Sequence, residues 1–328
     1  MLWVFLLLII FIAITVCCYF KCFHSPANRP IDPYSQLGIL EDNPRRDHLM
    51  KTTRIVDNTP HQDIYITSFD GLQLYGRYYH IQNGAPVEIL FHGYRSHALR
   101  DCSGGFMLAR KMGMNVLLVD QRAHGRSEGS AIGFGVLERR DCLSWAKYAA
   151  ARFGEQTPII LSGISMGGAT VIMASSLPLP KNVVCVLADC PYTSPSAIIR
   201  KVCRDKRLPD KLLYPFVYLS AKLFGRFSLT ESSAICEIAN TNLPVLLIHG
   251  EEDDFVPCQM SKEISAACKS KCQLQLFPDA DHGMSYMVDP VRYEEAVAKF
   301  LWEIPALQPE LSANDYVQKR LNGETDVL

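Results

Sequence analysis

After residue 60, short apolar runs alternate with segments of helical period. Residues 87–91, 115–119 and 158–163 are almost continuously apolar and are followed by polar or glycine-rich turns, as expected of strands buried on both faces. Residues 138–154 instead place charged and apolar residues at helical spacing and stop at a glycine. Strands that alternate with helices predict an α/β fold with a mostly parallel central sheet and helices on both faces.

Two stretches depart from this alternation. Residues 64–69 and 72–81 flank Asp70-Gly71, a dipeptide that favours a tight hairpin between antiparallel strands. Residues 192–240 are too many for a simple crossover between two buried strands, and they contain apolar helical segments. They are predicted to form either a small helical cap inserted over the site or crossover helices joined by a loop.

The N-terminal segment is apolar and uncharged from residue 2 to residue 20, which matches the ~20 residues of a membrane-spanning helix. No basic side chain precedes it and no clear small-residue cleavage site follows it, unlike a signal peptide. We expect an uncleaved, single-pass transmembrane anchor over residues 1–22. The positive-inside rule predicts that the remainder is cytoplasmic, because basic residues follow the run and none precedes it: Lys21, Arg29, Arg45 and Arg46.

These patterns predict the domain organisation. Residues 23–60 are rich in Pro, Asn, Asp and Arg, show no sustained period and are expected to be a linker. Residues 61–306 are long enough to form a single domain with a sizeable core. Residues 307–328 are a polar tail.

Charge and cysteine content exclude some classes of protein. The chain has 33 Lys and Arg against 34 Asp and Glu, so nothing favours a nucleic-acid partner. Its twelve cysteines include no C-x-x-C and no zinc-finger spacing. Most are expected to be small buried residues in a reducing compartment, with Cys268 and Cys272 at core positions one helical turn apart. No metal or organic cofactor is expected.

The segment Gly163-Ile164-Ser165-Met166-Gly167 fits the pattern G-x-S-x-G. A predicted strand precedes it and a predicted helix follows it, which is the context that a nucleophile elbow requires. The glycines leave room for a sharp turn, and the start of the helix favours developing negative charge. Ser165 is therefore the candidate nucleophile.

A serine hydroxyl needs a base to remove its proton, and a histidine base needs a carboxylate to orient it. In elbow-containing folds the order along the chain is serine, acid, histidine. The late strand 244–250 leads into four acids, and the strand 272–277 leads into Asp281-His282. His282 is the candidate base, while spacing alone leaves the acid open among Glu251, Glu252, Asp253 and Asp254. His92 and His249 are expected to make structural hydrogen bonds, and His124 lies upstream of the serine.

These motifs resemble those of the α/β-hydrolase superfamily over roughly residues 62–305. The loop His249-Gly250-x-x-Asp253-x-x-Val256-Pro257 is similar to the family's acid loop and implies Asp253 as the acid. The segment Asp281-His282-Gly283 is similar to its histidine loop. The resemblance thus implies a catalytic triad of Ser165, Asp253 and His282.

The same resemblance covers two further turns. His92-Gly93-Tyr94 is similar to the family's oxyanion turn, which implies that the backbone amides of Tyr94 and Met166 stabilise the oxyanion. The side chain of Tyr94 is expected either to reach the pocket or to pack. Residues 120–129 resemble the D-x-R-x-x-G-x-S-x-G turn, which we interpret as structural.

The resemblance predicts a serine hydrolase that cleaves carboxylic esters or thioesters through an acyl-enzyme. The substrate is expected to be a small acyl ester, with a membrane lipid ester as one candidate. One alternative is a serine peptidase similar to the prolyl-oligopeptidase and acylaminoacyl-peptidase catalytic domains, although the chain has no room for their usual propeller. A second alternative is a non-catalytic, membrane-tethered binding module on the same scaffold.

Overall fold

The computed structural model describes residues 2–25, 32, 34 and 45–324, whose strands form one eight-stranded sheet ordered β1-β2-β4-β3-β5-β6-β7-β8. The pairs β1–β2 and β2–β4 are antiparallel, and all other pairs are parallel. This confirms the predicted fold class. The strands are β1 (Gln62–Thr67), β2 (Gln73–Tyr79), β3 (Val87–Phe91), β4 (Asn115–Val119), β5 (Ile159–Ile164), β6 (Val183–Asp189), β7 (Val245–Gly250) and β8 (Cys272–Phe277).

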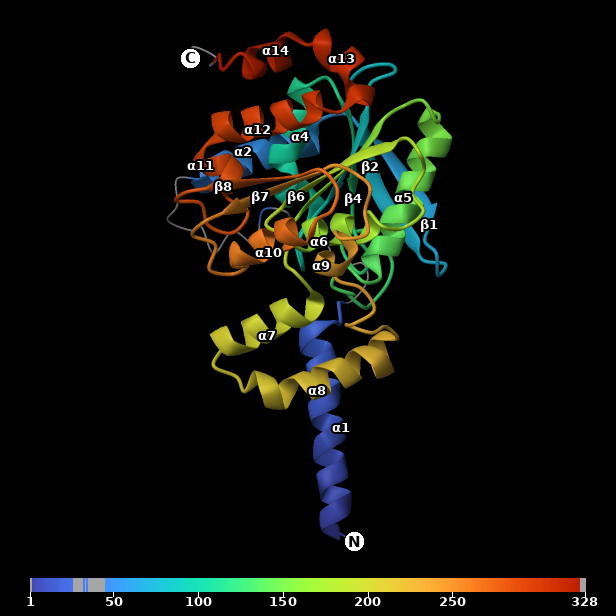
Figure 1. Ribbon diagram of the computed structural model, residues 1–328. Helices are drawn as coiled ribbons and strands as arrows, with labels where there is room; N and C mark the ends of the chain where they lie inside the picture. Colours follow the sequence, from blue (N-terminus) through green and yellow to red (C-terminus); the bar gives the residue numbers. More distant parts are fainter. Residues whose placement is uncertain (1, 26–31, 33, 35–44, 325–328) are drawn as a thin grey trace.

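Helices cover both faces of this sheet (Figure 1). One face carries α2 (Arg45–Asn58), α3 (Ala98–Asp101), α4 (Ser103–Lys111), α11 (Ser285–Val288) and α12 (Pro290–Trp302), continued by η3 (Pro305–Leu307), α13 (Gln308–Ser312) and α14 (Asp315–Leu321). The other face carries α5 (Glu138–Phe153), α6 (Met166–Ala174), α9 (Ala234–Glu237) and α10 (Gln259–Ala267). Every residue of β3 and β4 is buried, which explains why both strands are continuous apolar runs.

The antiparallel edge arises from the hairpin predicted around Asp70-Gly71. Its strands pair from Gln62 opposite Tyr78 to Thr67 opposite Gln73. Gly71 has a φ of 91°, which a residue with a side chain rarely adopts, so the glycine permits this tight connection. The hairpin prediction is confirmed.

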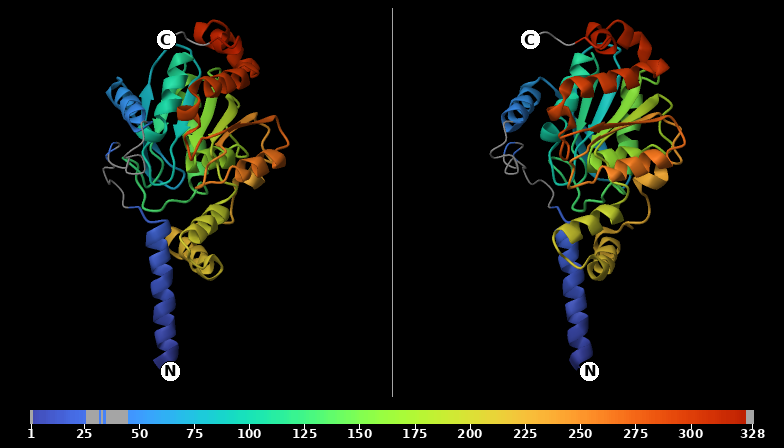
Figure 2. Two further views of the ribbon diagram at one scale, coloured as in Figure 1. Left: turned by 90° about the vertical axis from the view of Figure 1, so that its left-hand side faces the viewer. Right: turned by 60° about the vertical axis from the view of Figure 1, so that its left-hand side comes forward.

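Residues 192–240 form a helical insertion between β6 and β7. It contains α7 (Pro195–Asp205), α8 (Asp210–Ser220), the π-helical turn η2 (Ala221–Gly225) and the short α9. In both figures α7 and α8 project from the sheet domain on the side where the N-terminal helix leaves it (Figures 1 and 2). The insertion is thus helical, which both alternatives predict, so its helices do not distinguish a cap from crossover helices.

The N-terminal helix α1 (Leu2–Cys22) is long and apolar enough to cross a membrane, judged by its length and composition. Residues 2–13 are exposed, whereas Phe23, which follows the helix, is fully buried against Phe134 and Phe227. His24 then forms a β-bridge with Ala131. The N-terminal half of α1 therefore projects away from the sheet domain, and the C-terminal end of α1 packs against that domain.

Two segments contain helices that the sequence analysis does not predict. Helix α2 lies inside the predicted linker 23–60, and α13 and α14 lie inside the predicted polar tail 307–328. Helix α2 has few apolar residues (RRDHLMKTTRIVDN), so its hydrophobic period is too weak to reveal a helix. Its fully buried Val56 nevertheless belongs to the core cluster on the α4 and α12 face.

The cysteine predictions are partly wrong. All twelve cysteines are free. Most were expected to be buried, but only four of the twelve are, namely Cys102, Cys142, Cys185 and Cys190. Cys268 directly follows α10 and Cys272 begins β8, so the two do not share a helical turn. The intervening residues form the turn between the two elements, which local spacing does not reveal.

Candidate active site

Ser165 lies in a sharp turn between β5 and α6. Its φ of 56° is in the left-handed region, where a residue with a side chain costs about 1–3 kcal/mol of strain. Its amide donates a 2.8 Å hydrogen bond to the carbonyl of Asp189 on β6, which holds the turn at the sheet edge. This strand, strained turn and helix have the form of a nucleophile elbow.

The two glycines of the motif are required by close backbone packing. A Cβ on Gly163 would lie 2.3 Å from the carbonyl carbon of Gly167, and a Cβ on Gly167 would lie 2.0 Å from the carbonyl oxygen of Phe91. The obstructing atoms are backbone, so they cannot rotate away as a flexible side chain would. Gly163 therefore permits the tight turn from β5 into α6, and Gly167 permits the close approach of α6 to the end of β3.

We therefore expect Gly167→Ala to destabilise the fold. Overpacking typically costs about 1–3 kcal/mol, and a clash with backbone belongs at the upper end, so the Tm should fall by roughly 6–12 °C. Gly105→Ala is the matched control, since its Cβ would meet only the flexible side chain of Leu90, at 3.1 Å. Thermal unfolding by circular dichroism measures both, and equal Tm values for the two variants would contradict the packing account.

Three side chains from separate loops meet beside the elbow. Ser165, Asp253 and His282 follow β5, β7 and β8, and the carboxyl ends of parallel strands share one edge of a sheet. The Nε2 atom of His282 lies 2.9 Å from Ser165 Oγ, and its Nδ1 atom lies 2.7 Å from Asp253 Oδ2. With its proton on Nδ1, the imidazole can accept the serine proton while donating to the carboxylate.

Asp253 is held in place by several donors. The amides of Phe255 and Val256 donate to Oδ1 over 3.0 and 2.7 Å, and His249 Nε2 lies 3.2 Å from Oδ2. Burial by itself raises the pKa of Asp253, but the hydrogen bonds from His249, His282 and the backbone outweigh it and lower the pKa to about 2. The carboxylate therefore stays ionised across the ordinary range of pH.

The other three acids of this loop have different surroundings. Glu251, Glu252 and Asp254 are exposed, whereas the side chain of Asp253 is fully buried. Among these four residues, Asp253 is the one whose carboxylate accepts a hydrogen bond from His282.

The turn His92-Gly93-Tyr94 lies directly against the elbow. A Cβ on Gly93 would be 3.5 Å from the Cβ of Ser165. The Gly93 amide donates to Asp101 Oδ2 over 2.9 Å, and the Arg95 amide donates to His124 Nε2 over 2.9 Å. These bonds fix both ends of the turn, so Asp101 and His124 act as supports. The sequence analysis does not mention Asp101, and it describes His124 only as lying upstream of the serine.

The amides of Tyr94 and Met166 have no acceptor within the described residues. The Met166 amide is at the first position of α6, where helix N–H groups have no intrahelical partner. The Tyr94 side chain packs on Phe134 with ring centroids 4.8 Å apart, and its hydroxyl donates to the carbonyl of Cys22 over 2.8 Å. Both amides are thus available for a ligand, while the tyrosine ring is anchored by packing.

The turn at residues 120–129 has the structural character expected of it. Arg122 is buried and forms ion pairs with Asp70 at 2.9 Å and with Asp141 at 2.5 Å. The Ser127 hydroxyl accepts from the Tyr75 amide and donates to the Asp120 carbonyl. The Arg122 contacts join the turn to the β1–β2 hairpin and to α5, and the Ser127 contacts join it to β2.

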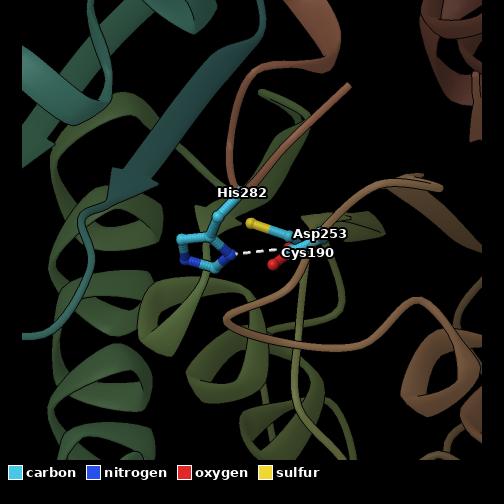
Figure 3. A group of neighbouring side chains, drawn as sticks. All are labelled: Cys190, Asp253 and His282. Carbon is cyan, nitrogen blue, oxygen red and sulfur yellow. Dashed lines mark hydrogen bonds and ion pairs between the residues drawn. The ribbon is translucent and has the colours of Figure 1, made fainter. Parts of the chain in front are cut away.

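Cys190 lies beside the acid and the histidine, with its sulfur next to the Asp253 carboxylate (Figure 3). Potential ligand atoms of Cys190, Asp253 and His282 lie within 4.8 Å of one another. Burial, reinforced by Asp189 and Asp253, raises the pKa of the Cys190 thiol well above its ordinary value. Both ring nitrogens of His282 already lie within hydrogen-bond distance of Asp253 and Ser165. The group therefore fits a hydrogen-bonded acid–histidine pair beside a neutral thiol better than a metal centre.

A cavity of about 500 Å³ begins at Ser165 and His282 and extends between the sheet and helices α4 and α12. This volume is in the range of ~300–1,000 Å³ that is typical of small-molecule sites. Its walls are mostly apolar, and they include Leu90, Leu108, Met112, Leu187, Val297 and Leu301. No described residue of the insertion 192–240 lines this cavity, so the insertion does not cover it as a cap.

Two buried carboxyl groups also line the cavity. Glu88 accepts a 2.5 Å hydrogen bond from Ser162, and burial raises the pKa of Glu88 to about 7. Asp189 Oδ2 accepts from Tyr293 over 3.1 Å, while Oδ1 has no partner among the described residues, and burial raises the pKa of Asp189 to about 6. The sequence signal for Glu88 is an acid in the middle of a buried strand, which the sequence analysis does not use.

Comparisons with known proteins agree with this architecture. A profile of the alpha/beta hydrolase family matches residues 89–296. The uncharacterized protein YqkD of Bacillus subtilis is 26% identical over 215 residues, which cover 65% of this chain and 70% of that protein. Monoglyceride lipase of Rattus norvegicus is 34% identical over 129 residues, covering 38% of this chain and 41% of the lipase. The esterase Pf2001 of Pyrococcus furiosus is 25% identical with a TM-score of 0.60, covering 76% and 92% of the two chains.

Proposed function

The chain belongs to the alpha/beta hydrolase family, and we propose that it is a serine hydrolase that cleaves carboxylic esters or thioesters with Ser165 as nucleophile. The observation that carries the proposal is the position of His282. Its two ring nitrogens lie 2.9 Å from Ser165 Oγ and 2.7 Å from Asp253 Oδ2. The buried, ionised carboxylate keeps the imidazole oriented to accept the serine proton.

The reaction proceeds in two halves. Ser165 Oγ attacks the acyl carbonyl carbon as its proton passes to His282 Nε2, and Asp253 stabilises the imidazolium. The amides of Tyr94 and Met166 stabilise the negative charge on the carbonyl oxygen. The bond to the leaving alcohol or thiol then breaks, His282 protonates it, and an acyl-Ser165 ester remains. Water attacks this ester with His282 again as base, which releases the carboxylic acid and restores Ser165.

The apolar cavity supports an acyl group of apolar character as the substrate part that enters the protein. The similarity of the chain to an esterase and to a monoglyceride lipase also supports an ester with an apolar acyl group as the substrate. A lipid ester accordingly becomes the favoured substrate class. The unpartnered oxygen of Asp189 favours a second candidate, a serine peptidase, because it could pair with the ammonium group of an aminoacyl substrate.

Helix α1 is proposed to be a single-pass membrane anchor with the catalytic domain on the cytoplasmic side. Its 21 residues match the thickness of a bilayer core, and its last turn carries Lys21. The basic residues that follow it favour the cytoplasmic side. The free state of all twelve cysteines is consistent with a reducing compartment.

Rates on matched substrates distinguish the two enzymatic functions. Nitrophenyl esters of acetate to dodecanoate are compared with aminoacyl nitroanilides, and Ser165→Ala provides the blank for both series. The proposal predicts kcat/KM values for the esters at least roughly 100-fold above those for the amides. Among the esters, the highest kcat/KM is expected for an acyl chain longer than acetyl. Faster hydrolysis of the aminoacyl amides would favour the peptidase, and no hydrolysis above the blank would exclude both.

The acyl-chain preference should depend on Gly105, which lines the cavity on α4. We expect Gly105→Leu to fill the space next to Leu90, where even a Cβ lies 3.1 Å from the leucine side chain. The kcat/KM for nitrophenyl octanoate should fall roughly 10–100-fold, while the kcat/KM for nitrophenyl acetate changes less than about threefold. Arg110→Leu, an exposed position on the same helix, is the control. An unchanged ratio of octanoate to acetate in Gly105→Leu would show that the acyl chain lies elsewhere.

A further inference from the structure

Helix α8 runs across α1 below the catalytic domain (Figures 1 and 2). The ring of Phe216 on α8 lies 5.1 Å from the ring of Phe11, and Phe224 just after α8 lies 5.6 Å from Tyr19. Phe11 is the middle residue of the uncharged run 2–20. The insertion therefore contacts the anchor at its midpoint as well as at its end.

This contact limits where a bilayer can lie. At ~1.5 Å per residue, residues 2–10 extend only about 14 Å past the α8 contact, which is less than half of a hydrocarbon core of ~30 Å. The whole run 2–20 extends about 28 Å and matches that core. If this run crosses the membrane, α8 must lie within the membrane boundary and not above it.

The surface of α8 suits such a position. Outside α1, six large apolar side chains of the described residues are exposed, and four of these belong to the insertion: Leu208, Leu212, Leu223 and Phe224. Leu212 and Leu223 are 65% and 58% exposed, and no charged residue lies between Lys211 and Lys222. A helix satisfies its own backbone hydrogen bonds, so α8 can enter an apolar medium without exposing unpaired groups.

Basic side chains lie around this apolar surface. Residues 200–226 contain eight Lys and Arg against two Asp, in a chain whose net charge is -1. Asp205 pairs with Lys201, and Asp210 pairs with Arg204. Five further basic side chains are exposed and have no ion pair within the described residues, namely Lys206, Arg207, Lys211, Lys222 and Arg226. This excess of positive charge is complementary to anionic lipid headgroups.

We propose that α8 and η2 form an interfacial membrane-binding element that inserts Leu212, Leu223 and Phe224 among the acyl chains of an anionic bilayer, beside α1. The five exposed basic side chains without an ion pair then contact the headgroups, although Lys222 also lies 5.0 Å from the centre of the Tyr218 ring. This proposal rests on the membrane anchor of the proposed function and adds a second, non-spanning contact to it. Together, α1 and α8 fix both the height and the orientation of the catalytic domain on the membrane.

The candidate site is also attached to the C-terminal end of the anchor. The Tyr94 hydroxyl donates to the carbonyl of Cys22 over 2.8 Å, and the Arg95 guanidinium donates to the carbonyl of His24 over 3.0 Å. Tyr94 also lines the cavity that begins at Ser165. The oxyanion turn is thus attached to the end of the anchor, on the side of the domain where a bilayer lipid ester would arrive.

Depth-dependent fluorescence quenching tests the insertion in the full-length protein. The reporters Leu212→Trp and Leu223→Trp are each made in a background of Trp3→Phe and Trp302→Phe and reconstituted into phosphatidylcholine vesicles with about one third phosphatidylglycerol. The emission of this background, which retains the buried Trp145, is subtracted from that of each reporter. Lipids brominated near the headgroup end of the acyl chain are the quencher for the α8 reporters, and lipids brominated near the terminal methyl group are the quencher for a reporter close to the bilayer centre. Ile9→Trp reports on the anchor, and Tyr65→Trp, at an exposed position on β1, is the matched control outside the insertion.

The brominated lipids are expected to reduce the emission of the Leu212, Leu223 and Ile9 reporters roughly twofold and that of the Tyr65 reporter by less than about one tenth. Quenching at Ile9 but not at Leu212 and Leu223 would overturn the α8 proposal and leave the anchor intact. No quenching at Ile9 would overturn both membrane contacts. Equal quenching at Leu212 in vesicles without phosphatidylglycerol would contradict the headgroup contacts. Ester hydrolysis by the same variants is measured separately, so loss of catalysis cannot be mistaken for loss of membrane binding.

Discussion

Ser165→Ala is expected to lower kcat/KM for nitrophenyl esters by roughly 10⁴-fold or more, while the Tm stays within a few degrees of the wild type. The substitution removes the atom that attacks the acyl carbon, and the amides of Tyr94 and Met166 alone retain only a small residual rate enhancement. Alanine adds no atom to the crowded elbow. The measurement is initial-rate kinetics on purified full-length protein in detergent, with thermal unfolding of the same samples.

Ser176→Ala is the matched control for this change. Ser176 lies just beyond α6, and its hydroxyl donates to Glu237, away from the cavity. Its kcat/KM should stay within about twofold of the wild type. Ester hydrolysis at an undiminished rate in Ser165→Ala would mean that another group is the nucleophile.

Asp253→Asn should produce a loss of similar size, about 10⁴-fold in kcat/KM. The carboxylate accepts a 2.7 Å hydrogen bond from His282 Nδ1, which keeps the Nε2 atom free to accept the serine proton. An asparagine amide can donate to Nδ1 instead, and this favours the tautomer that cannot act as base. Because the pKa of Asp253 is about 2, the wild-type charge that is removed is present at every working pH.

The neighbouring acids provide controls for the charge change. Glu252→Gln and Asp254→Asn each remove one negative charge from an exposed position in the same loop. We expect both to stay within about threefold of wild-type kcat/KM, since exposed charges are screened by solvent. A loss in Asp254→Asn as large as that in Asp253→Asn would contradict the assignment of the acid.

Local sequence patterns were sufficient to predict the frame of the candidate site. The elbow at Ser165 follows from a glycine-flanked serine between a predicted strand and a predicted helix. His282 and the group of four acids follow late strands, and parallel strands bring such loops to one edge of the sheet. The choice of Asp253 came from the resemblance to the family, because exposure and hydrogen bonding, which separate it from its three neighbours, are tertiary properties.

Other features depended on packing between distant segments and could not be predicted. The cavity exists because α4 and α12 leave space above the sheet, and no local period encodes the separation of two helices. The structural hydrogen-bonding role expected of His249 agrees with its contacts, but its partner Asp253 could not be predicted, nor could the support that His124 gives to the amide of Arg95. The insertion could be identified as helical from its apolar segments, but its contact with α1 joins residues about 200 positions apart.

The central claim is that Ser165 is a nucleophile activated by His282. The most direct test is labelling with a fluorophosphonate, followed by intact-mass measurement and peptide mapping of wild type, Ser165→Ala and His282→Gln. The account predicts one adduct per wild-type chain, located on Ser165, no adduct in Ser165→Ala and labelling slowed by roughly 10³-fold or more in His282→Gln. An adduct on another residue, or wild-type protein that hydrolyses esters while remaining unlabelled, would contradict it.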